Sequence, residues 1–115
     1  MSLPPVHVVD VSSEQATFDI EVSAELEAFR GHFPGRPILP GVVQIDWAVR
    51  LAALHLGIGK PVARDFQVKF RNVIRPGNAI SLTLQLDRSK NRLLFTYKSK
   101  AVVMSDGQIK LEAKI

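Results

Sequence analysis

The sequence predicts an α+β domain in which one long helix packs against an antiparallel sheet. Apolar residues dominate a single continuous stretch, Val42 to Leu56, and a glycine stands on either side of it. Most of the chain after this stretch alternates apolar and polar residues, which is the two-residue period of half-buried strands. The connections between those strands are short, and short connections join antiparallel neighbours. With 115 residues, the chain is expected to form a single domain, residues 1–115.

The predicted strands follow from alternation and from turn residues. Residues 16–22 alternate apolar and polar side chains and predict a strand before the helix. Residues 34–41 hold three prolines and two glycines, so we expect an ordered loop there. After the helix, strands are predicted around residues 66–70, 80–86, 93–104 and 109–113, separated by turns at 75–78, 87–91 and 105–107.

The predicted helix, Val42 to Leu56, is apolar on nearly every face. Its apolar residues are interrupted only by Gln44, Asp46, Arg50 and His55. A helix that is apolar all round is expected to be buried on all sides. One small sheet cannot cover such a helix, so the remaining surface needs a wrapping loop or another chain. We therefore expect a dimer.

Composition excludes several classes of protein. Apolar residues make up 46% of the chain and charged residues 23%, as in an ordinary globular domain. The absence of cysteine excludes disulfides, thiolate nucleophiles and cysteine-ligated metals. The three histidines are far apart in the sequence, so no metal site and no cofactor are expected. The N-terminus does not resemble a secretory signal, and no apolar stretch has the roughly 20 residues of a membrane span. We expect a cytoplasmic protein without membrane contact.

The net charge of +4 and the pI near 9.8 permit three interpretations. A basic protein can bind nucleic acid, attract an acidic carrier protein, or simply have a solvated basic surface. The basic residues are spread along the chain, with no stripe interleaved with aromatic residues, so nucleic acid is not an expected partner. Charge alone does not decide between the other two interpretations.

The junction between loop and helix carries the candidate chemistry. His32 stands in the proline-stiffened segment, and histidine exchanges protons near neutral pH. Gly41 precedes the helix, whose first N–H groups can stabilise an oxygen that gains negative charge. Asp46, if buried in an apolar helix, would hold its proton tightly enough to act as a general acid. The plainer interpretations are a loop histidine with structural hydrogen bonds and an ion pair between Asp46 and Arg50 at i,i+4.

The run His32-Phe33-Pro34-Gly35-x-Pro37-x-x-Pro40-Gly41-Val42 resembles the signature loop of the 3-hydroxyacyl-(acyl-carrier-protein) dehydratases of the FabA/FabZ type. The spacing of fourteen residues from His32 to Asp46 is similar as well. A second segment, Phe70 to Gly77, resembles a later strand and turn of that family. The resemblance extends from about residue 15 to the end of the chain.

This resemblance implies a hot-dog fold, in which an antiparallel sheet wraps a long central helix. It implies a homodimer, or a higher oligomer of dimers, with His32 of one chain facing Asp46 of the other. His32 would take a proton from the carbon beside the thioester carbonyl, and Asp46 would protonate the departing hydroxyl. The N–H groups of Gly41 and Val42 would hold the carbonyl oxygen. The product would be a trans-2-enoyl thioester in fatty-acid, polyene or polyketide biosynthesis.

The resemblance also suggests which residues bind the rest of the substrate, either an acyl carrier protein thioester or a coenzyme A thioester. Phe33 and Trp47 are expected to line the acyl tunnel, where Trp47 replaces a small residue and would narrow it. The residues expected to attract an acidic carrier are Arg36, Arg64, Lys69 and Arg71.

Two departures from the family pattern bear on activity. Asp46 matches the dehydratase–isomerase branch, whereas the loop is closer to the plain dehydratases, so isomerase activity is not predicted. Arg50 replaces a common glutamine and would weaken proton donation if it pairs with Asp46. The alternatives are a hot-dog thioesterase, which does not need the His32 loop, and a non-catalytic acyl-binding subunit, which would not need the His32 and Asp46 pair.

Overall fold

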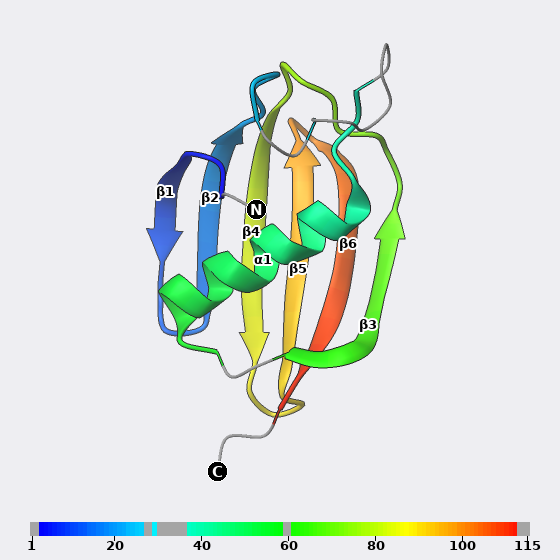
Figure 1. Cartoon of the computed structure of the whole chain (residues 1–115). Coiled ribbons are helices and arrows are strands. Elements are labelled where there is room, and N and C mark those ends of the chain that lie inside the picture. The colour runs from blue at the N-terminus through cyan, green and yellow to red at the C-terminus, as the bar shows by residue number, and fades with distance from the viewer. Residues whose placement is uncertain (1–2, 27–28, 30–36, 59–60, 113–115) are drawn as a thin grey trace.

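The described residues form one six-stranded antiparallel sheet and one α-helix, which crosses the concave face of the sheet (Figure 1). The computed structural model describes residues 3–26, 29, 37–58 and 61–112, with the backbone alone at 61–64. The strand order is β1-β2-β4-β5-β6-β3. The predicted α+β class is confirmed. The elements are β1 (Val6–Val11), β2 (Gln15–Glu21), α1 (Gly41–Leu56), β3 (Pro61–Phe70), β4 (Ala79–Asp87), β5 (Arg92–Ser99) and β6 (Val102–Leu111).

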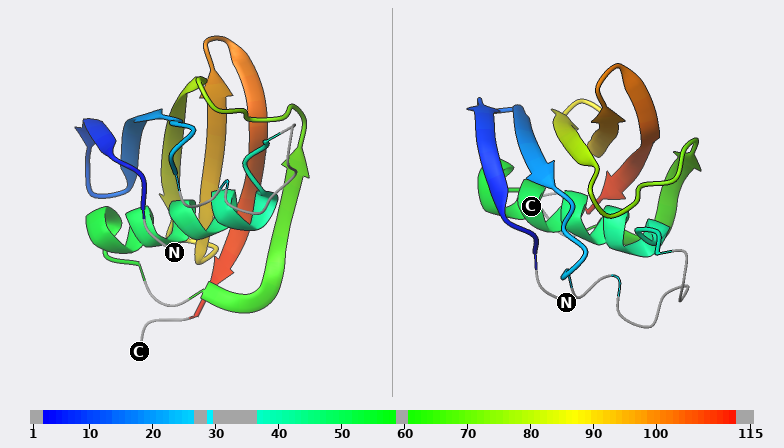
Figure 2. Two further views of the ribbon diagram at one scale, coloured as in Figure 1. Left: turned by 45° about the horizontal axis from the view of Figure 1, so that its top comes forward. Right: turned by 90° about the horizontal axis from the view of Figure 1, so that it is seen from above.

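The hydrophobic core lies between α1 and the concave face of the sheet. Every second residue of the central strands points into this core, because successive side chains of a strand point to opposite faces. Phe18 on β2 is opposite Leu82 on β4, and Leu82 is opposite Tyr97 on β5; all three are fully buried. Figure 2 shows the sheet curling around the helix, so that α1 is covered from one side.

The helix begins at Gly41, one residue before its predicted start, and ends at Leu56 as predicted. Gly57 ends it with a φ of 61°, a left-handed conformation that glycine adopts without steric cost. The side of α1 that faces away from the sheet is open, with Val42 71% exposed and Leu54 68% exposed. The sheet thus covers only one side of the helix, as expected for a single small sheet, and burial of the other side by a second chain remains a prediction.

Three titratable residues, Asp46, Arg50 and His55, lie in the sixteen-residue helix. Within the described part of the chain, no helix is long and apolar enough to cross a membrane. The same residues include no group of three His, Cys, Asp or Glu side chains that could hold a metal ion.

The turn predicted at residues 105–107 is wrong, because these residues lie inside β6. The chain instead reverses at Lys100-Ala101, and Lys100 adopts a φ of 56° there. Ser105 is fully buried, and a Cβ at Gly107 would lie 2.6 Å from the backbone oxygen of Gln67. Small residues occupy these positions because β6 packs closely, and they do not mark a turn.

Strand β1 is absent from the sequence prediction. The pairing of β1 with β2 shifts register between Val8 and Asp10, so apolar residues do not keep a two-residue period along the strand. Strand β3 contains the predicted alternation at residues 66–70 but starts five residues earlier, at Pro61.

Candidate active site

The N-terminus of α1 presents backbone donors for which the described part of the chain supplies no acceptor. Pro40 occupies the N-cap position and makes no side-chain hydrogen bond to the first turn. Its carbonyl accepts hydrogen bonds from the amides of Val43 (3.1 Å) and Gln44 (3.2 Å). The N–H groups of Gly41 and Val42 have no acceptor among the described residues. Both donors, together with the positive end of the helix dipole, can therefore stabilise an oxygen that gains negative charge.

A hollow of about 380 Å³ opens beside these donors. The ring of Phe70, the last residue of β3, lies over Gly41. A Cβ at position 41 would lie 2.5 Å from the Cζ atom of this ring, so any side chain at that position would displace it. The hollow is lined by Ile38, Leu39, Pro40, Gly41, Gln44, Phe70, Arg71, Asn72 and Val73.

Gln44 connects the first turn of α1 to the sheet. Its side chain is buried, donates from Nε2 to the carbonyl of Leu39 (3.1 Å) and accepts at Oε1 from the hydroxyl of Ser105 (2.6 Å). Its backbone carbonyl accepts a further hydrogen bond from the hydroxyl of Tyr97 (2.6 Å). Burial raises the pKa of Tyr97 well above its usual value, and the charge of Asp46 raises it further. The tyrosine therefore remains a protonated donor.

Asp46 does not lie in the hollow but on the open side of α1. Its side chain is 41% exposed and accepts a hydrogen bond from Arg50, with 3.5 Å between Oδ2 and Nη1. The expectation that Asp46 is buried is thus wrong for a single chain, because the sheet does not reach this side of the helix. The anticipated i,i+4 ion pair is present.

Trp47, the next residue of α1, is 1% exposed in the core. Its indole Nε1 is buried without a hydrogen-bond partner among the described residues. Contact between Trp47 and an acyl chain remains a prediction.

Three predicted site residues, His32, Phe33 and Arg36, lie outside the described residues, and so does the side chain of Arg64. The described residues therefore bring Gly41 and Val42 together at one end of α1, with Asp46 further along the same helix. The approach of His32 to any of them remains a prediction.

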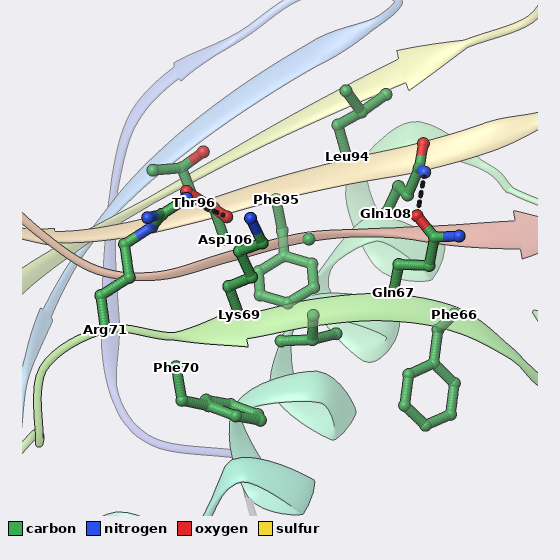
Figure 3. Close-up of a pocket in the computed structure, with 12 residues that line it drawn as sticks. Phe66, Gln67, Lys69, Phe70, Arg71, Leu94, Phe95, Thr96, Asp106 and Gln108 are labelled. Carbon is green, nitrogen blue, oxygen red and sulfur yellow. Dashed lines mark hydrogen bonds and ion pairs between the residues drawn. The ribbon is translucent and has the colours of Figure 1, made fainter.

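Lys69 and Arg71 lie on the opposite side of β3 from Phe66 and Phe70 (Figure 3). Arg71 pairs with Asp106 on β6 through Nε (3.1 Å) and Nη2 (3.4 Å). Lys69 is exposed and makes no ion pair with any described residue. Both residues line a hollow of about 870 Å³ between β3, β5 and β6.

Sequence reasoning missed the polar side chains that hold the helix start. Gln44 interrupts an apolar helix, which is a signal of a buried hydrogen bond, but its partners are far away in the sequence. The sequence pattern predicts a turn at Ser105 and a strand at Tyr97, and neither pattern indicates a bond to Gln44.

A helix wrapped by a curled antiparallel sheet (Figure 2) defines a hot-dog protein. The chain belongs to the ApeI-like family, described as ApeI dehydratase, which residues 8–108 match. In the dehydratase heterocomplex ApeI:P from Xenorhabdus doucetiae, a similar chain is 34% identical with a TM-score of 0.86, covering 95% of this chain and 97% of that one. The predicted hot-dog fold and FabZ-like family are confirmed.

Curated relatives carry the name 3-hydroxyacyl-[acyl-carrier-protein] dehydratase FabZ. The protein from Oenococcus oeni is 32% identical over 72% of this chain and 65% of its own length. The protein from Ligilactobacillus salivarius is 32% identical over 85% of this chain and 73% of its own length. Mouse thioesterase superfamily member 2 has a TM-score of 0.66 with 14% identity over 90% of this chain and 78% of that one, which shows the shared fold alone.

Proposed function

We propose that this chain removes water from a 3-hydroxyacyl thioester and releases a trans-2-enoyl thioester. The observation that carries the proposal is the pair of N–H groups at Gly41 and Val42, which have no acceptor among the described residues, at the end of α1 where Gly41 lines a hollow of about 380 Å³. A thioester carbonyl gains negative charge when the neighbouring carbon loses a proton. Donors that already point at such an oxygen lower the barrier to this step.

In the proposed reaction, the carbonyl oxygen accepts hydrogen bonds from Gly41 and Val42. His32 takes the proton from the carbon beside the carbonyl, and the electrons of that C–H bond form the new double bond. The bond between the third carbon and its hydroxyl breaks, and Asp46 protonates the departing oxygen to give water. Proton exchange with solvent then restores neutral His32 and protonated Asp46. No metal or cofactor takes part.

We further propose that the active site is shared between two chains. Asp46 lies on the open side of α1, where Val42 and Leu54 are 71% and 68% exposed, while the hollow lies beside the first turn. A second chain on this open side would bury the apolar residues and bring its own His32 to Asp46. We expect a homodimer; because the relative from Xenorhabdus doucetiae belongs to a heterocomplex, an unlike hot-dog subunit is the alternative occupant.

The substrate is proposed to be held on an acyl carrier protein, with coenzyme A as the alternative carrier. The curated relatives are named for the carrier protein. The chain's net charge of +4 is compatible with an acidic partner, and exposed Lys69, which makes no ion pair with any described residue, is a candidate to attract one. Arg36, Arg64 and Arg71 remain further candidates.

The test uses purified protein, 3-hydroxyacyl thioesters of several lengths and mass spectrometry. We expect a product lighter by one water in the wild type, and activity lower by about 10²- to 10⁴-fold in His32→Ala and in Asp46→Asn. His7→Ala and Asp19→Asn are matched controls, because this exposed pair lies on β1 and β2 and should retain full activity. Release of a free acid would indicate a thioesterase instead, and no turnover at all would indicate a non-catalytic acyl-binding subunit.

Mixing the two inactive variants tests whether the site is shared. A mixed dimer of His32→Ala and Asp46→Asn chains contains one intact composite site and should recover activity. Monomeric protein at micromolar concentration, measured by sedimentation, would contradict the shared site.

A further inference from the structure

We infer that Gln44 is a positioning residue, which aims the N–H groups of Gly41 and Val42 at the thioester oxygen. This inference rests on the proposed function. Gln44 lies one turn after Gly41 and lines the same hollow as Gly41 and Phe70. It would act through the helix backbone, without taking part in proton transfer.

Both the amide nitrogen and the amide oxygen of the Gln44 side chain form hydrogen bonds. Its Nε2 donates to the carbonyl of Leu39, two residues before the helix, at 3.1 Å. Its Oε1 accepts from the hydroxyl of Ser105, on the strand β6, at 2.6 Å. Gln44 is 3% exposed and Ser105 is fully buried, so water does not compete for either bond. This one side chain thereby fixes the entry into α1 relative to the sheet.

A second bond holds the same turn from the backbone. The hydroxyl of Tyr97, on β5, donates to the carbonyl of Gln44 at 2.6 Å. The lead-in segment has its own anchor, because the amide of Leu39 donates to the carbonyl of Ile74 at 2.8 Å. The helix start is thus tied to β5, to β6 and to the segment after β3, and Gly41 and Val42 lie between these ties.

Structural need alone does not account for this arrangement. An apolar side chain at position 44 and alanine at position 105 would fill the core without polar groups, and such paired replacements are often nearly neutral for stability. A hydrogen-bonded network additionally fixes the orientation of the helix start, and with it the direction of the Gly41 and Val42 N–H groups. Catalytic donors need this, because a displacement of about 1 Å can cost on the order of 10² in rate.

The experiment compares Gln44→Leu with Gln108→Leu in the full chain. Gln108 is the matched control, since its side chain bonds Gln67 and Arg92 on the other face of the sheet. We expect Gln44→Leu to lower kcat by about 10- to 100-fold, with KM changed by less than about threefold and an unchanged pH profile. Gln108→Leu should keep the wild-type kcat. Both variants are assayed at least about 20 °C below their own Tm, so that unfolding does not contribute.

Gln44→Glu provides a conservative rescue. A protonated glutamic acid can donate to Leu39 and accept from Ser105, whereas a carboxylate cannot donate. We expect the activity of this variant, relative to the wild type at the same pH, to rise as pH falls. An unchanged kcat in Gln44→Leu at a lowered Tm would overturn the inference, because Gln44 would then serve stability alone.

A second measurement separates this inference from the proposed function. If the wild type removes no water from any thioester, the proposed function fails. Hydrogen exchange of the backbone amides in the first turn of α1 still tests whether Gln44 fixes the position of that turn. We expect the amides of Val43 and Gln44, which are bonded to Pro40, to exchange at least about tenfold faster in Gln44→Leu and at the wild-type rate in Gln108→Leu. Equal exchange in all three proteins overturns the inference.

Discussion

Adding one methyl group at Gly41 should separate activity from stability. In Gly41→Ala, the new Cβ would lie 2.5 Å from Cζ of Phe70 and 2.9 Å from both Cε atoms. Carbon atoms prefer separations of about 3.5–4.0 Å, so the ring must retreat by about 1 Å. The ring can do so because Phe70 is 53% exposed.

Two opposing effects set the stability of this variant. Alanine is favoured over glycine within a helix by up to about 1 kcal/mol. Partial loss of contact by the half-exposed ring of Phe70 costs about the same amount. The free energy of unfolding should therefore change by less than about 1 kcal/mol. The added methyl group enters the hollow that Gly41 lines and should hold the thioester oxygen away from the Gly41 and Val42 donors. Loss of one such donor contact lowers kcat by about 10²- to 10³-fold.

Gly107→Ala is the matched control for this experiment. Its new Cβ would lie 2.6 Å from the backbone oxygen of Gln67, which cannot move without disturbing the pairing of β3 with β6. Such overpacking costs about 1–3 kcal/mol. Urea unfolding and dehydration kinetics on folded protein should show a stable, inactive Gly41→Ala and an active, destabilised Gly107→Ala. Wild-type kcat/KM in Gly41→Ala would refute the assignment of these amides to the substrate.

Three further predictions concern residues outside the core. Arg50→Gln removes the half-exposed i,i+4 ion pair with Asp46, a type of pair that contributes about 0.3–0.5 kcal/mol, so urea titration should show a free energy of unfolding lowered by at least this amount. Lys69→Glu should slow turnover of a carrier-bound substrate several-fold at low salt and leave turnover of a soluble N-acetylcysteamine thioester unchanged. Lys98→Glu is the control. Equal losses on both substrates would contradict a carrier contact at Lys69. Leu54→Lys should give a folded monomer in sedimentation, because it charges the open side of α1, and an unchanged dimer would place the interface elsewhere.

The parts of the fold that depend on local pattern could be predicted from the sequence. The helix is bounded by Pro40-Gly41 and by Gly57, and β4 keeps a strict alternation from Ile80 to Leu86. Strand β1 could not be predicted, because its register shift interrupts the alternation. The turn at Lys100-Ala101 lacks the glycine or asparagine that usually marks a hairpin. Ser105 and Gly107 suggested a turn because the sequence does not show which strands pack against them.

The candidate site likewise has a part that the local sequence predicts and a part that depends on contacts between distant residues. The positions of Gly41 and Val42 at the helix start follow from the proline and glycine before a long apolar run. The exposure of Asp46 could not be predicted, since it depends on how far a sheet built from distant segments extends around the helix. The hydrogen bond from Ser105 to Gln44 joins residues 61 positions apart, and no local pattern reveals such a bond.

The N-cap of α1 has a consequence for engineering this protein. Serine or aspartate in place of Pro40 would supply the missing cap, and such caps commonly stabilise helices by about 0.5–2 kcal/mol. The same oxygen would compete with the substrate for the first-turn amides, and aspartate would also repel a developing negative charge. A screen for heat resistance would therefore select variants at position 40 that a screen for turnover rejects. Under the proposed function, the uncapped helix would be a stability–activity trade-off located at a single residue.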